Sequence, residues 1–122
     1  MNKSPKLIRS CCEEVSYLSD IKKTLPLEHE LNELTSIFKA ISDPSRAKIL
    51  FALLDYEICV GEMAKLLELP QSNVSHQLKI LREYGIVTYE KDKKMSFYRI
   101  KNDSVKELLL TALKSIKCQT KK

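Results

Sequence analysis

The sequence is poor in the residues that interrupt helices. It contains 2 Gly, 4 Pro, 2 His and no Trp among 122 residues. Leu, Lys, Glu, Ile and Ala are plentiful, so the composition favours a mostly helical chain with few strands. The length suits one compact domain with a single hydrophobic core.

Long apolar runs are also missing. No run approaches the roughly 18 residues of a membrane span, and the opening segment MNKSPKLIRSCCEE lacks the apolar stretch of a signal peptide. We therefore expect a cytoplasmic protein without a membrane partner. In a reducing cytosol the four cysteines are expected to be free thiols or metal ligands rather than structural disulfides.

Charge is unevenly distributed along the chain. Residues 28–64 carry three basic and seven acidic residues, a net charge of −4, whereas residues 65–101 carry eight basic and four acidic residues, a net charge of +4. The second region is therefore predicted to face phosphate or another polyanion. No Cys-His or Ser-His-Asp grouping supports catalysis, and we do not expect an enzyme.

Apolar spacing predicts a mainly α fold with a small β-hairpin. We expect an N-terminal arm over 1–27, one main domain over 28–118, and a basic tail over 119–122. The predicted elements are a short arm helix near 12–20, a helix from Glu28, a helix after the N-cap Asp43, a helix over about 59–67 that buries Met63, Leu66 and Leu67, a helix over 71–83, a hairpin formed by IVTYE and MSFYRI, and a helix over about 103–117. The last helix is too apolar for a small domain to cover, so we expect a second subunit to cover it.

Two short helices joined by a tight turn, the second with a polar N-terminal half, are typical of a helix-turn-helix. Short donors and acceptors on that second helix can reach base edges or phosphates in a major groove, and basic residues of the hairpin can hold the adjacent DNA backbone. The candidate DNA-binding residues are Gln71, Ser72, Asn73, Ser75, His76, Gln77 and Lys79 on the helix, and Lys91, Lys93, Lys94 and Arg99 on the hairpin.

The segments FKAISDPSRAKIL and SNVSHQLKILREYGIV extend this interpretation. Over about residues 30–117 the chain resembles the ArsR/SmtB family of metal-sensing winged-helix repressors. The resemblance implies a homodimer that pairs through its first and last helices, binds double-stranded operator DNA, and releases it when a metal ion binds. It also implies that residues 71–83 are the recognition helix and residues 86–100 the wing.

Family members bind their inducers at different positions. One group uses an Asp-x-His and a His-x-x-Glu on the last helix, and these positions correspond to Asn102, Ser104, Ser115 and Cys118 here. Three of these four cannot bind zinc, so a zinc or nickel site there is not expected. Another group uses a CVC motif at the third helix, where this chain has Cys59 followed by Gly61 in place of the second cysteine.

Two adjacent thiols in the arm can supply the missing ligands. The family resemblance implies a site built from Cys11, Cys12 and Cys59, with Cys118 as an optional further donor. Soft thiolates select thiophilic ions. Three thiolates favour As(III) or Sb(III) as the inducer, and a fourth donor would suit Cd(II) or Pb(II).

Other interpretations of these residues remain open. A single buried cysteine such as Cys59 is more often a small hydrophobic core residue than a ligand. The same thiols could also form a redox switch, in which Cys11 or Cys12 makes a disulfide or polysulfide bridge with Cys59 or Cys118. His76 is better explained by DNA contact or helix packing than by metal binding, and His29 is expected to be a surface residue.

Overall fold

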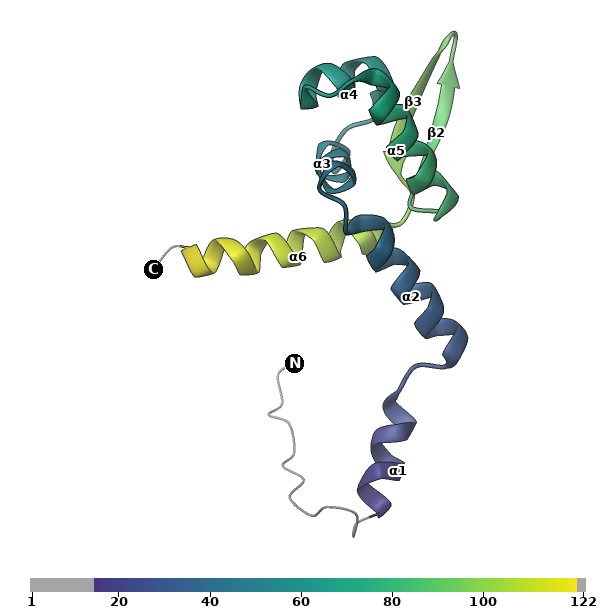
Figure 1. Cartoon of the computed structure of the whole chain (residues 1–122), viewed down its shortest axis with the longest axis vertical. Coiled ribbons are helices and arrows are strands. Elements are labelled where there is room, and N and C mark those ends of the chain that lie inside the picture. Colours follow the sequence, from purple (N-terminus) through teal and green to yellow (C-terminus); the bar gives the residue numbers. More distant parts are fainter. Residues whose placement is uncertain (1–14, 121–122) are drawn as a thin grey trace. The chain divides into compact units, whose positions relative to one another are not determined.

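The computed structural model describes residues 15–120, and the side chains of 17–118 (Figure 1). The elements follow in the order α1 (Val15–Thr24), α2 (Glu28–Ile41), α3 (Pro44–Ala52), β1 (Ile58–Cys59), α4 (Val60–Leu67), α5 (Gln71–Glu83), β2 (Val87–Asp92), β3 (Met95–Ile100) and α6 (Asp103–Thr120). The chain divides into two compact units, residues 1–33 and residues 34–122. None of the helices among the described residues is long and apolar enough to cross a membrane.

The helices lie close to the predicted ranges, with small differences at their ends. The arm helix α1 ends at Thr24 rather than near residue 20. The helix predicted over about 59–67 is α4, which begins at Val60 and has Cys59 as its N-cap residue. Asp43 caps α3 as predicted, because its Oδ2 accepts a hydrogen bond from the Arg46 backbone N–H at 3.1 Å.

The sheet has one strand more than predicted. The hairpin of β2 and β3 is present, with Val87 opposite Ile100 and Asp92 opposite Met95. The two-residue strand β1 adds to the other edge of β3, where Cys59 lies opposite Phe97, so the strand order is β1-β3-β2. A two-residue strand is too short to show an alternating pattern, and its pairing partner lies far away in sequence. The sequence therefore does not predict β1.

The hydrophobic core lies in the second unit, among α3, α4, α5, the sheet and the start of α6. Its largest fully buried side chains are Ile49, Leu50, Leu53, Met63, Val74, Leu78, Leu81, Ile86, Val87 and Val105. This core fixes the position of α5, whose buried stripe of Val74, Leu78 and Leu81 turns its opposite face outward.

Leu66 does not join this core, and the prediction that it is buried was wrong. Its side chain is 61% exposed, whereas Met63 and Ala64 are buried. The buried face of α4 is therefore centred on the side of Ala64, and Leu66 falls beyond its edge. Leu66 instead lines an open apolar cavity of about 580 Å³ together with Ala47 and Phe51.

Gly85 ends the recognition helix in a left-handed conformation. Its φ is 75°. The Gly85 N–H donates to the Arg82 carbonyl at 2.9 Å, and the Ile86 N–H donates to the Leu81 carbonyl at 3.0 Å. These two bonds form a Schellman motif, which satisfies carbonyls that the end of a helix leaves without partners.

Replacing Gly85 by Ala is expected to lower the free energy of unfolding by about 1 kcal/mol, because a Cβ disfavours the left-handed region. No atom lies within 4 Å of the position of that Cβ, so a clash would not contribute. Gly61 is the control, since its Cβ position is equally open and its φ is not left-handed. Urea denaturation should show a loss for Gly85→Ala and none for Gly61→Ala. Equal losses would contradict the backbone explanation.

Candidate DNA-binding surface and thiol site

The helix-turn-helix consists of α4, a short turn and α5. The turn begins at Glu68, which has a left-handed φ of 55°, and ends at Pro70. The Pro70 carbonyl accepts the backbone N–H groups of Asn73 and Val74 at 3.0 and 3.1 Å, which starts α5 without a side-chain cap. Pro suits this place because its ring holds φ at the value that the turn requires.

Five of the seven helix residues predicted to contact DNA are exposed on α5. They are Gln71, Ser72, Ser75, His76 and Lys79. The other two, Asn73 and Gln77, are half-buried on the flank of the helix. The Asn73 Oδ1 atom is buried and has no hydrogen-bond partner among the described residues.

Gln77 is held by a residue that the sequence analysis did not select. The Arg46 Nη1 atom donates to Gln77 Oε1 at 2.9 Å. The same guanidinium donates from Nε to the Ala40 carbonyl at 2.6 Å and from Nη2 to the Lys39 carbonyl at 3.4 Å. The segment SDPSR pointed to a helix start at Asp43, but no spacing rule connects Arg46 with a residue 31 positions away.

The wing carries its basic residues at two different places. Lys91, Lys93 and Lys94 are exposed at or beside the two-residue turn of the hairpin. Arg99 lies near the other end of β3, opposite Thr88, and its guanidinium is 3.9 Å from the Glu90 carboxylate. Among residues 17–118 no ion pair involves these three lysines, whereas Arg99 shares its charge with Glu90.

Aromatic contacts join the wing to the recognition helix. The Arg82 guanidinium lies 5.1 Å from the centre of the Tyr89 ring, and the Tyr89 and Tyr98 ring centres are 5.2 Å apart. The contact between Arg82 and Tyr89, which sequence reasoning missed, joins α5 to the neighbouring strand β2, and the ribbons of α5 and the hairpin can be followed in Figure 1. The positive charge of Arg82 therefore lies over the Tyr89 ring.

Cys59 lies at the junction between the sheet and the helix-turn-helix. Its side chain is 4% exposed, and its thiol is 3.7 Å from Glu62 Oε1, to which the thiol can donate. It lines a cavity of about 340 Å³ that is also lined by Gln71, Ser75 and Lys94. One cavity is thus lined both by Cys59 and by residues of the predicted DNA-binding face.

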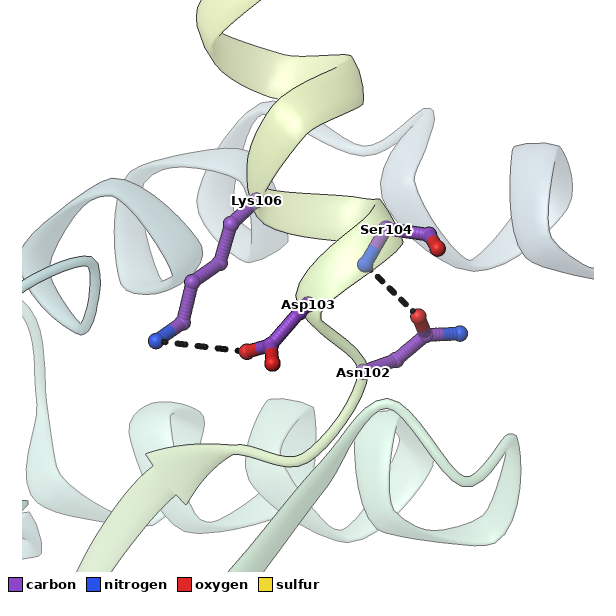
Figure 2. Close-up of polar contacts among 4 residues, drawn as sticks. All are labelled: Asn102, Asp103, Ser104 and Lys106. Atoms are coloured by element: carbon purple, nitrogen blue, oxygen red, sulfur yellow. Dashed lines mark hydrogen bonds and ion pairs between the residues drawn. The ribbon is translucent and has the colours of Figure 1, made fainter.

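The start of the last helix is occupied by a capping arrangement (Figure 2). The Asn102 Oδ1 atom accepts the Ser104 backbone N–H at 2.9 Å, and the Lys106 ammonium is 3.7 Å from the Asp103 carboxylate. Asn102 and Ser104 stand at two of the positions where one group of the family carries metal ligands. Here the Asn102 side chain instead accepts the Ser104 backbone N–H at the N-terminus of α6.

The predicted thiol site is only partly within the described residues. Cys11 and Cys12 lie outside them. Cys59 and Cys118 are both free thiols, the first buried and the second exposed on α6. Between residues 15 and 120 no three His, Cys, Asp or Glu side chains are grouped so that they could hold a metal ion.

Comparison with known proteins places this fold among bacterial regulators. Residues 43–89 match the model of the bacterial regulatory protein, arsR family. A Cadmium resistance transcriptional regulatory protein CadC homolog from Staphylococcus aureus is 33% identical over 79% of this chain and 84% of its own length.

Two solved structures agree with this assignment. The transcriptional repressor BigR from Xylella fastidiosa is 31% identical, with a TM-score of 0.67 over 81% of this chain and 94% of that chain. A homodimeric winged helix-turn-helix DNA-binding domain from Mycobacterium bovis has the same fold, at a TM-score of 0.68 and 21% identity over 77% of this chain and 90% of that chain. The CadC homolog is named as a transcriptional regulatory protein and BigR as a transcriptional repressor. The chain belongs to the ArsR/SmtB family of winged helix-turn-helix transcriptional repressors.

Proposed function

We propose that this chain is a cytoplasmic homodimeric repressor that binds operator DNA and is released by a thiophilic metal ion held by Cys11, Cys12 and Cys59. Residues 28–118 bind DNA and form the dimer, and the arm over 1–27 supplies two of the thiols. The observation that carries the proposal is the position of Cys59, a buried cysteine that lines a cavity together with Gln71 and Ser75.

Operator binding is supported by the exposed polar face of α5 and the basic tip of the wing. A helix in the major groove presents such a face to base edges, and lysines beside it neutralise phosphates. The DNA-contacting set comprises Gln71, Ser72, Asn73, Ser75, His76, Gln77 and Lys79, with Lys91, Lys93 and Lys94 in the wing. Arg99 is the weakest member of the original set, because it is paired with Glu90 near the base of the wing.

Dimer formation is supported by apolar side chains that the single chain leaves exposed. On α6 these are Leu108, Leu110 and Ile116, and on α2 within the second unit they are Leu34 and Phe38. Exposed apolar residues on these helices are typical of a protein–protein interface. A two-fold dimer would present two recognition helices to half-sites about 34 Å apart on the operator.

Cadmium becomes the first candidate for the ion, ahead of arsenite and antimonite. Three thiolates alone would suit As(III) or Sb(III), but the Glu62 carboxylate lies 3.7 Å from the Cys59 thiol and adds an oxygen donor. Cd(II) and Pb(II) accept a fourth ligand, and a cation would offset the charges of a neighbouring thiolate and carboxylate. The relative from Staphylococcus aureus carries cadmium resistance in its name.

Binding of the ion and binding of the operator are thermodynamically linked, so each changes the affinity of the other. An ion that binds the DNA-incompetent dimer more tightly must weaken operator binding by the same factor, typically about 5- to 150-fold. Drawing Cys59 towards thiols of the arm would deform the cavity that Gln71 and Ser75 share with it. The two recognition helices would then no longer match successive major grooves.

Absorption spectroscopy tests the ion site directly. Cd(II), Pb(II) and As(III) are titrated separately into the reduced protein, and the thiolate charge-transfer band is followed. We expect saturation at one ion per subunit, with Cd(II) or Pb(II) displacing As(III). A band that Cys11→Ser and Cys12→Ser each leave unchanged would exclude the arm from the site.

The second candidate function is a thiol redox or polysulfide switch in the same fold. It is favoured by the two free thiols of the described region, one of which, Cys118, is exposed near the end of α6. A bridge between an arm thiol and Cys59 or Cys118 would tie distant segments together. Titrating oxidant and metal ion separately in an operator-release assay distinguishes this function from metal sensing.

A further inference from the structure

The Arg46 guanidinium is a junction between two helices. Through Nε it binds the Ala40 carbonyl in the last turn of α2, and through Nη1 it binds the side chain of Gln77 on α5. Carbonyls at a helix C-terminus lack partners within the helix, and a positive charge there is favourable. The Arg46 side chain therefore has a structural reason to stay in place while it holds Gln77.

Hydrogen bonds to Asp43 hold the backbone of Arg46 in place at the start of α3. The Arg46 N–H is bound by the Asp43 carboxylate at 3.1 Å, and the Ala47 N–H by the Asp43 carbonyl at 2.9 Å. Pro44 at the first position of α3 further restricts this turn. Arg46 thus extends from a rigid helix start rather than from a loop.

The contact also decides which way the Gln77 carboxamide faces. A guanidinium can only donate hydrogen bonds, so the atom of Gln77 at 2.9 Å from Nη1 must be the oxygen. The two N–H donors of the Gln77 amide then lie at the opposite edge of the planar carboxamide from Arg46. A glutamine that reads adenine uses both its oxygen and its nitrogen. In Gln77 the oxygen already accepts a bond from Arg46, so the amide N–H groups are the atoms that this arrangement leaves to face a partner.

We propose that Arg46 is a positioning residue that presents the Gln77 amide nitrogen as a hydrogen-bond donor to an acceptor on the operator. The acceptor is a phosphate oxygen or a base atom such as guanine O6 or N7. This inference rests on the proposed operator binding and adds a residue that does not itself contact DNA. It also ties the last turn of α2, a predicted dimer helix, to the recognition helix.

A double-mutant cycle tests the coupling between the two side chains. A labelled duplex is first selected from a random library by the wild-type protein, and its dissociation constant is measured by fluorescence anisotropy. Gln77→Met and Arg46→Met should each weaken binding about 5- to 10-fold, the size expected for one hydrogen bond. The affinity loss of the double variant should not exceed the larger of the two single losses, because both substitutions remove the same contact.

Folding is checked by circular dichroism and thermal unfolding of every variant. If Arg46→Met does not fold, Arg46→Lys takes its place in the cycle, since one ammonium cannot span the acceptors on α2 and Gln77. Additive losses for Arg46 and Gln77, or unchanged affinity in Gln77→Met, would overturn the inference. Failure of the wild-type protein to select any duplex would instead overturn the proposed function itself.

The same binding measurements distinguish a phosphate acceptor from a base acceptor. A loss in Gln77→Met that is equal on the selected duplex and on an unrelated duplex assigns the acceptor to the DNA backbone. A loss confined to the selected duplex assigns it to a base. Both results support the donor role of Gln77, whereas the absence of any loss opposes it, as additive losses in the cycle do.

Discussion

Replacing Ser72 by Glu is expected to reduce operator affinity on the order of 100-fold without unfolding the protein. Ser72 is the second residue of α5, and its side chain is exposed on the face predicted to enter the major groove. A carboxylate within a few ångströms of a phosphate raises the free energy of the complex by about 2–4 kcal/mol. The protein alone gains slightly, since an acidic residue is favourable in the first turn of a helix.

Ser104 provides a matched control for this substitution. It is the second residue of α6 and is also exposed, so Ser104→Glu adds the same charge at the same place in a helix. Anisotropy with a labelled operator duplex should show affinity within about twofold of wild type for Ser104→Glu, because its carboxylate lies away from the proposed DNA surface. Similar losses in the two variants would mean that net charge alone, rather than α5, controls DNA binding.

Replacing Cys59, Cys11 or Cys12 by Ser is expected to abolish release of the operator by the metal ion. Each variant should bind the operator as the wild-type protein does, since none of these cysteines belongs to the proposed DNA-contacting set. The roughly 5- to 150-fold weakening by the ion should disappear, because hydroxyl oxygen is a poor ligand for soft ions. The measurement is operator anisotropy with and without Cd(II) under reducing conditions.

Two further variants make this result interpretable. Cys59 is buried, so Cys59→Ala accompanies Cys59→Ser to separate loss of a ligand from burial of a hydroxyl group. Cys118→Ser is the control, because Cys118 is exposed on α6 and is only an optional donor. If the ion still releases the operator fully from all of the Cys11, Cys12 and Cys59 variants, the proposed thiol site is contradicted.

The fold was predictable where the signals are local. The recognition helix was placed at residues 71–83, and α5 occupies Gln71–Glu83. Pro70, the apolar stripe and Gly85 all lie within or next to that helix. The polar face was predictable for the same reason, since helical periodicity alone decides which side chains oppose Val74 and Leu78.

Features that depend on distant contacts were not predictable. β1 is two residues long and is defined by its pairing with β3. Arg46 meets Gln77, and Arg82 meets Tyr89, only after the chain has folded. The exposure of Leu66 follows from a small rotation of α4 about its axis, which no pattern of eight residues determines.

The candidate site was predicted in part. The structure places Cys59 at the start of the helix-turn-helix and also brings Glu62 next to its thiol, a donor that the sequence analysis did not weigh. Cys11 and Cys12 remain predicted ligands outside the described residues. Their role depends on the chemistry of thiols and on what the family resemblance implies.

The measurement that tests the account most directly is release of the operator by a thiophilic ion. The reduced wild-type protein is bound to its labelled duplex, and Cd(II), Pb(II) and As(III) are added separately while anisotropy is followed. We predict that Cd(II) releases the duplex and that release is complete at one ion per subunit. If the duplex stays bound in excess of all three ions and dissociates only on addition of an oxidant, the proposed metal site is contradicted and the thiols form a redox switch.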